Sequence, residues 1–119
     1  MKETFRDIKG YEGLYKVSDL GNVVRVHKGS KEDTLRKLHI ARNGYVYIDL
    51  YKRNKRKKFY VHQLVAKTFL NNELNKEQVN HIDGNKPNNK LSNLEWVTRS
   101  ENMKHAYDNG LCGGFVTRH

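Results

Sequence analysis

The chain has 119 residues, and its 23 Lys and Arg against 13 Asp and Glu give a formal net charge of +10. This length suits one compact unit, or two small modules that share a modest core. Its single cysteine, Cys112, excludes an intrachain disulfide and a cysteine-based zinc site. Because the sequence also lacks a signal peptide pattern and a long apolar run, we expect an intracellular protein with no membrane partner.

The positive charge is concentrated in the first half of the chain. Residues 1–60 hold 16 Lys and Arg against 7 Asp and Glu, whereas residues 61–119 hold 7 against 6. A basic surface attracts polyanions through long-range electrostatics and counterion release, so nucleic acid is the expected partner. A basic surface that is only solvated is the alternative.

The first half is predicted to form short strands joined by tight turns. Residues 15–18 and 23–26 flank the sequence Asp19-Leu20-Gly21-Asn22, whose Gly and Asn favour the backbone angles of a tight reversal. This segment is therefore predicted to be a hairpin.

A second hairpin is predicted around Asn43-Gly44, the strongest short signal for such a turn. Its strands would be residues 35–41 and 45–51. In the second of these, aliphatic residues alternate with three tyrosines and Asp49. One face is therefore expected to be aliphatic and buried, and the other aromatic and polar.

The segment that follows the second hairpin carries six cations in seven residues. It is predicted to form a basic loop, whose like charges repel unless phosphates neutralise them. A solvated turn tip is the alternative. The candidate DNA-binding residues are Lys52, Arg53, Lys55, Arg56, Lys57 and Lys58.

A change of periodicity predicts a helix over residues 61–70. Its apolar face would pack between the sheet and the segment that follows. His62 lies off this face, and we interpret it as a capping or buried hydrogen-bonding histidine rather than a ligand. The apolar face comprises Val61, Leu64, Val65 and Phe69.

A second helix has a clear start. The sequence Thr98-Arg99-Ser100-Glu101 matches the capping box, in which the threonine and glutamate side chains bond to each other's backbone N–H. The helix is predicted over residues 99–108 and would end at Asn109-Gly110. Asn102 and His105, three residues apart, would share one face.

Two blocks of the sequence resemble one known family. The first runs from Phe5 to Ser18 and continues with Gly21-Asn22-Val23, and the second comprises residues 61–69 and the stretch from Val79 to Tyr107. They are similar to the NUMOD-type DNA-binding module and to the nuclease half, respectively, of phage-type HNH homing endonucleases. Phe5 stands where Trp is more usual. The two blocks cover most of residues 5–108 in the family's order, which is more specific than an isolated His-Asn-His spacing.

The resemblance implies an α+β fold, with a small antiparallel β-rich N-terminal module followed by a ββα-metal (HNH, His-Me finger) nuclease motif. Residues 1–58 would form the basic DNA-binding module, residues 59–110 the nuclease domain and residues 111–119 a mobile tail. Residues 79–81 and 94–96 would be the two strands of the nuclease motif, and the capped helix would lie across them.

The segment between these strands, residues 82–93, reads as a long loop. It is rich in Asn and contains Gly84 and the single Pro, so its side chains are expected to hydrogen-bond to their own backbone. Asp83, followed by a glycine, is interpreted as a turn former rather than a ligand. Trp96 is interpreted as the core anchor of the motif.

The resemblance also implies an activity, namely metal-dependent hydrolysis of phosphodiester bonds in duplex DNA by a nicking or homing endonuclease associated with phage. In the family the histidine of the first strand activates water, which assigns His81 as general base. Asn93 matches the residue that holds the loop and orients the base. Asn80 and Asn102 match protein ligands of Mg²⁺ or Mn²⁺. His105 is a third candidate ligand. Alternatively, it would contact a phosphate or hydrogen-bond to a ligand without touching the metal.

Two other functions are compatible with the sequence. Many relatives have aspartate where this chain has Asn80, so a DNA-binding protein with a weakened or lost nuclease site is one of them. An RNA-binding module, based on the charge and the tyrosines, is the other. No small-molecule cofactor is expected. The chain would act as a monomer or weak dimer in the cytoplasm of a phage-infected or prophage-carrying bacterium.

Overall fold

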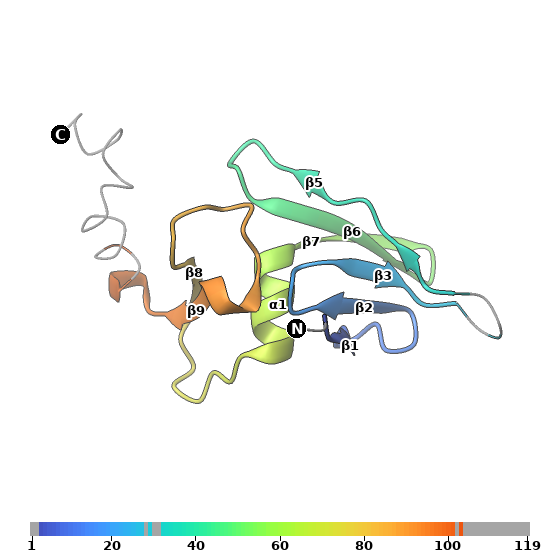
Figure 1. Ribbon diagram of the computed structural model, residues 1–119, viewed down its shortest axis with the longest axis horizontal. Coiled ribbons are helices and arrows are strands. Elements are labelled where there is room, and N and C mark those ends of the chain that lie inside the picture. The colour runs from blue at the N-terminus through green and yellow to red at the C-terminus, as the bar shows by residue number, and fades with distance from the viewer. Residues whose placement is uncertain (1–2, 28, 30–31, 102, 104–119) are drawn as a thin grey trace.

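The computed structural model of the protein describes residues 3–27, 29, 32–101 and 103. Three antiparallel sheets pack around helix α1 (Val61–Phe69) (Figure 1). Their strand orders are β1-β2-β3-β4, β5-β6-β7 and β8-β9. The α+β architecture predicted from the sequence is confirmed. The strands are β1 (Phe5–Asp7), β2 (Tyr15–Ser18), β3 (Val23–Arg25), β4 (Thr34–Leu35), β5 (His39–Ile40), β6 (Val46–Lys52), β7 (Lys55–Tyr60), β8 (Gln78–His81) and β9 (Leu94–Val97), and a short 3₁₀ turn (Leu91–Asn93) precedes β9.

The predicted hairpin around residues 19–22 is confirmed as the antiparallel pair β2 and β3. Ser18 closes its turn, because its Oγ accepts hydrogen bonds from the backbone N–H groups of Leu20 and Asn22 at 3.2 and 3.0 Å. Strand β1 adds to the free edge of β2 and was not predicted. Its three residues are too few to show an alternating pattern.

The second predicted hairpin is confirmed around Asn43-Gly44, where the glycine adopts a φ of +88°. The expectation of one strand over residues 35–41 is wrong. Leu35 belongs to β4, which pairs with β3 of the first sheet, whereas β5 pairs with β6 of the second. The chain crosses from one sheet to the other between these two short strands, and Leu38 packs against the core at the crossing.

The basic run over residues 52–58 is a strand hairpin, and not the loop predicted from its charge. Strands β6 and β7 pair along its length, and only Arg53 and Asn54 form the turn, with φ of 52° and 63°. Because side chains alternate across a strand, Arg56 and Lys58 share the face of Tyr47. Neighbouring cations point to opposite faces, which reduces their repulsion. The face that carries Leu50 also carries Lys52, Lys55 and Lys57.

Helix α1 lies between the two N-terminal sheets and the β8–β9 hairpin, and it contacts strands of all three sheets. Its predicted apolar face is confirmed, because the residues of that face are buried or pack against the core. None of the helices in the described residues is long and apolar enough to cross a membrane. One hydrophobic cluster joins the sheets through α1 and includes Val17, Leu50, Val65 and Leu94.

The predicted capping box starts a second helix. Thr98 Oγ1 accepts a hydrogen bond from the Glu101 N–H at 3.1 Å, and Glu101 Oε1 accepts one from the Thr98 N–H at 2.8 Å. Residues 99–101 and 103 are helical. The predicted end of this helix and the predicted tail lie outside the described residues.

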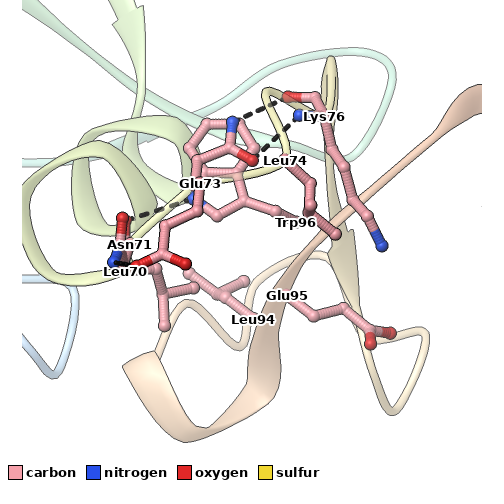
Figure 2. Close-up of a pocket in the computed structure, with 9 residues that line it drawn as sticks. Leu70, Asn71, Glu73, Leu74, Lys76, Leu94, Glu95 and Trp96 are labelled. Carbon is pink, nitrogen blue, oxygen red and sulfur yellow. Dashed lines mark hydrogen bonds between the residues drawn. The ribbon is translucent and has the colours of Figure 1, made fainter.

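Trp96 anchors β9 to the end of α1 by a hydrogen bond rather than by full burial. Its half-buried indole donates from Nε1 to the Leu70 carbonyl at 3.3 Å. The indole lines a pocket of about 470 Å³ together with other residues of β9 and of the segment after α1. Figure 2 shows these side chains. The Asn72 side chain bonds to both the N–H and the carbonyl of Lys76, at 2.9 and 2.8 Å. These contacts fix the connection that leads into β8.

Candidate active site

Asn80 and His81 are the last two residues of β8. In the antiparallel register with β9, Glu95 lies opposite Asn80 and Leu94 lies opposite His81. Only 7% of Asn80 and 5% of His81 is exposed to solvent. The hairpin therefore holds both candidate residues in fixed positions at the start of the loop over residues 82–93.

Asp83 and Asn93 tie the two ends of this loop together. The Asp83 N–H donates to Asn93 Oδ1 at 3.0 Å, and Asn93 Nδ2 donates to Asp83 Oδ1 at 2.9 Å. Asn93 Nδ2 also donates to the Asn88 carbonyl at 2.9 Å. Hydrogen bonds from the Asn88 side chain and the Asn85 N–H lower the pKa of the Asp83 carboxyl. Asp83 is thus a turn former, as predicted, and it stays ionised at neutral pH.

His81 is oriented by Asn89 in the middle of the same loop. Its Nε2 lies 2.8 Å from Asn89 Oδ1, and 5% of each residue is exposed. Burial lowers the pKa of His81, although the hydrogen bond to Asn89 and the charge of Asp83 act in the opposite direction. A lowered pKa keeps the imidazole neutral at neutral pH, which is the form that accepts a proton.

His62 and Tyr45 complete the surroundings of His81. Tyr45 stacks on His62 with ring centroids 4.9 Å apart, and His62 lies 5.0 Å from the His81 ring. His62 is buried, and its Nδ1 has no hydrogen-bond partner among the described residues. Burial, with a smaller contribution from the charge of His81, lowers the pKa of His62 to about 4. The predicted burial of His62 is confirmed, but the described residues offer no hydrogen bond to its Nδ1.

Asn80 offers an amide oxygen to a metal ion. Its Nδ2 donates to Glu95 Oε2 at 2.7 Å, and this hydrogen bond leaves the amide oxygen for another partner. Amide oxygens suit hard divalent cations, so the donor type fits such an ion. The described part of the chain contains no group of three or more His, Cys, Asp or Glu side chains that could hold a metal. The acidic side chain in contact with Asn80 is Glu95, which accepts its hydrogen bond.

Lys86 connects the loop to the turn between β5 and β6. Its Nζ donates to the Asn43 carbonyl at 2.7 Å and lies 4.8 Å from the centroid of the Tyr45 ring. Its charge also contributes to lowering the pKa of His81. A cation thus flanks the candidate base.

The structure brings three of the predicted site residues together, namely Asn80, His81 and Asn93. Asn102 and His105 lie outside the described residues. Asn89 was not predicted, because it is one of four asparagines in the loop and no spacing distinguishes it. Glu95 could have been found, since the antiparallel strand register places it opposite Asn80.

Comparison with known proteins gives the family of both halves. A profile of HNH endonucleases matches residues 59–104, and one of the NUMOD4 motif matches residues 3–51. DNA endonuclease I-HmuI of Bacillus phage SP01 is 43% identical over 89% of this chain and 59% of its own length. The uncharacterized HNH endonuclease L245 of Acanthamoeba polyphaga mimivirus is 44% identical over 82% of this chain and 28% of its own length. A solved structure concerned with DNA binding and cleavage by I-HmuI matches 90% of this chain and 59% of that one, with a TM-score of 0.79 and 42% identity.

We predict that the protein loses stability in mild acid because the folded state holds His62 neutral. Its folded pKa of about 4 lies below the usual 6.5, so between these values the unfolded chain binds a proton that the folded chain does not. The free energy of unfolding should fall as the pH decreases through this window, by at most about 3 kcal/mol for His62. His81 contributes in the same direction. Urea denaturation at several pH values measures the effect.

The His62→Phe variant keeps an aromatic ring against Tyr45 and cannot titrate, so it should flatten this pH dependence. His39→Phe, at an exposed position beside Tyr47, is the matched control and should leave the dependence as in the wild type. An equally steep loss of stability in His62→Phe would contradict the prediction.

Proposed function

The chain belongs to the HNH homing endonucleases that carry a NUMOD4 motif, and we propose that it hydrolyses phosphodiester bonds in duplex DNA. The observation that carries this proposal is the buried imidazole of His81, which a hydrogen bond to Asn89 orients and burial keeps neutral. Such a group suits the general base that removes a proton from the attacking water. The phage origin of I-HmuI supports a role in a phage-infected or prophage-carrying bacterium.

The HNH family implies a divalent metal, and we propose Mg²⁺ or Mn²⁺. When bound, the ion would stabilise negative charge on the phosphate and on the leaving 3′-oxygen, which gives a 5′-phosphate product. Asn80 would hold it through Oδ1, with Asn102 as the second protein ligand. His105 is the further candidate ligand. Because both amides are neutral, a DNA phosphate would complete the site, and the free protein would bind the metal weakly.

We propose that residues 1–58 hold the duplex and that residues 59–110 cut it. The duplex would be held by the face of the β6–β7 hairpin that carries Tyr47, Arg56 and Lys58, here called the aromatic face. On this face Lys58 Nζ lies 4.4 Å from the centroid of the Tyr47 ring. A hollow of about 500 Å³ on this face is also lined by Arg42. Cations beside aromatic rings suit a partner that has both phosphates and stacked sugars and bases.

Contacts between aromatic rings connect this face to His81, the candidate base. Tyr60 at the end of β7 contacts Tyr45 edge to face, with centroids 5.7 Å apart, and Tyr45 lies 5.8 Å from the His81 ring. Lys86 stands over the Tyr45 ring. A strand of DNA held on the hairpin would therefore pass Lys86 next to His81. A cation at this place suits a scissile phosphate.

A DNA-binding protein without cleavage is the second candidate function. The observation that favours it is the neutral Asn80, whose amide already bonds to Glu95. Supercoiled plasmid incubated with Mg²⁺ or Mn²⁺ separates the two, because a nuclease relaxes the plasmid and a binder only retards it. One ββα site cuts one strand at a time. A monomer would therefore nick, and a double-strand break would need a weak dimer or two binding events.

We predict that His81→Ala abolishes nicking and leaves DNA binding nearly unchanged. Removal of a general base should lower the single-turnover rate by at least ~10²-fold, while the duplex is held by cations elsewhere. His27→Ala is the control and should nick normally, because His27 bonds to Thr34 in the first sheet, away from the aromatic face. Wild-type nicking by His81→Ala would show that another group activates water.

We predict that the two faces of the basic hairpin differ in their contribution to binding. Arg56→Ala with Lys58→Ala should lower the slope of log affinity against log salt by about 2 units if each cation meets one phosphate. Lys55→Ala with Lys57→Ala removes the same charge from the opposite face and should change the slope less. Equal slopes for the two double variants would contradict a grip by the aromatic face.

We predict that Asn80→Asp strengthens metal binding and weakens the metal-free protein. The new carboxylate would stand where Asn80 Nδ2 now lies 2.7 Å from Glu95 Oε2, so the two like charges repel until a cation neutralises them. Mg²⁺ or Mn²⁺ should therefore raise the melting temperature of this variant more than that of the wild type.

The double variant Asn80→Asp with Glu95→Gln is the control, because a glutamine amide can donate a hydrogen bond to the new carboxylate. It should recover the metal-free stability. If neither variant changes the response of the melting temperature to metal, Asn80 does not ligate the ion.

A further inference from the structure

The middle of the loop that carries Asn89 rests on the β2–β3 turn of the N-terminal half. The Leu91 N–H donates to the carbonyl of Asp19 in this turn at 2.7 Å. Gly21 lies directly against Asn89, since a Cβ added to this glycine would be 3.1 Å from Asn89 Cβ and 3.2 Å from the Asn89 carbonyl oxygen. The turn and the loop therefore touch at backbone level, with no long flexible side chain between them.

The turn is itself held firmly. The Asp19 N–H donates to the Thr4 carbonyl at 3.1 Å, and the Thr4 N–H donates to Asp19 Oδ1 at 3.0 Å. Ser18 is fully buried beneath the turn and bonds to two of its backbone N–H groups. A turn that is fixed at several points can hold the loop in one position.

The hydrogen bond between Asn89 and His81 selects one tautomer of the imidazole. Asn89 presents its carbonyl oxygen to Nε2 at 2.8 Å, and a carbonyl oxygen can only accept. The hydrogen of the neutral ring must therefore be on Nε2. Nδ1 then carries the lone pair.

We propose that the β2–β3 turn is a positioning element of the active site. In it Asp19 holds the loop at Leu91 and Gly21 holds it at Asn89, and Asn89 holds His81 with Nδ1 ready to accept the proton of water. The proposal rests on the function proposed above, in which His81 is the general base. The NUMOD4 part of the chain would then contribute to catalysis as well as to DNA binding. Asn89 and Gly21 touch no substrate in this scheme and act through His81.

Gly21→Ala tests the contact between the turn and the loop in the full chain. Gly10→Ala is the matched control, because Gly10 has the same φ of +88° but nothing within 4 Å of an added Cβ. Both variants introduce similar backbone strain, and only Gly21→Ala pushes against Asn89. Gly21→Ala should lower the nicking rate at saturating DNA by on the order of 10-fold at unchanged DNA affinity. Equal rates in the two variants would overturn the proposal.

Asn89 variants test the next step. Asn89→Leu removes the acceptor at similar size and should lower the nicking rate about 10- to 100-fold, whereas Asn89→Asp keeps an acceptor and should recover most of the rate. If Gly21 acts through Asn89, Gly21→Ala should have little further effect in the Asn89→Leu background. Equal loss in Asn89→Leu and Asn89→Asp, or full additivity with Gly21→Ala, would overturn the proposal.

Nitrogen-15 spectra of the histidine rings test the tautomer without any substrate. The wild type at neutral pH should show His81 protonated on Nε2 and bare on Nδ1, and this pattern should weaken in Asn89→Leu. A proton on Nδ1 in the wild type would overturn the positioning proposal. A wild type that shows the expected tautomer but never nicks DNA would instead overturn the proposed function and leave the structural link from Asn89 to His81 in place.

Discussion

The mutual hydrogen bonds between Asp83 and Asn93 are the interaction on which the candidate site depends. Ordering a backbone residue costs about 1–2 kcal/mol, and the loop over residues 82–93 has few apolar side chains with which to offset that cost. Its order comes instead from amide and carboxylate side chains that bond back to the backbone. With both ends of the loop closed in this way and its middle resting on the β2–β3 turn, Asn89 presents one oxygen to His81.

Burial of two histidines is the second constraint, and it explains the aromatic surroundings of the site. Nδ1 of His62 is buried and has no hydrogen-bond partner in the described part of the chain, and such a nitrogen destabilises a fold by about 1–3 kcal/mol. The stacking of His62 on Tyr45 offsets part of that loss. Burial favours the neutral form of both His62 and His81, so their adjacent rings do not repel each other. It also keeps His81 in the form that can accept a proton.

Elements that depend on neighbours within a few residues were predicted from the sequence. Strand partners far apart in the chain were not. The turn at residues 19–22, helix α1 and the capping box at Thr98 depend on neighbours within a few residues, and all three were predicted. The split of residues 35–41 between two sheets depends on partners elsewhere in the chain. So does the division of the basic run at residues 52–58 into two faces, because only the register with β6 shows which cations lie together.

In the proposed function, the charge pattern of the site would couple DNA binding to metal binding. Its side chains nearest the base are neutral amides and rings. The charged residue types nearby include Glu95, Lys86 and Asp83, whose carboxyl is occupied by the loop's own hydrogen bonds. Such a site would attract a divalent cation weakly until a phosphate arrives. The phosphate would be drawn first by the basic hairpin, which lies on a different sheet and shares one hydrophobic core with the β8–β9 hairpin. Because a shared core limits independent movement of the two parts, the position of the duplex on the hairpin would then determine which phosphate reaches His81.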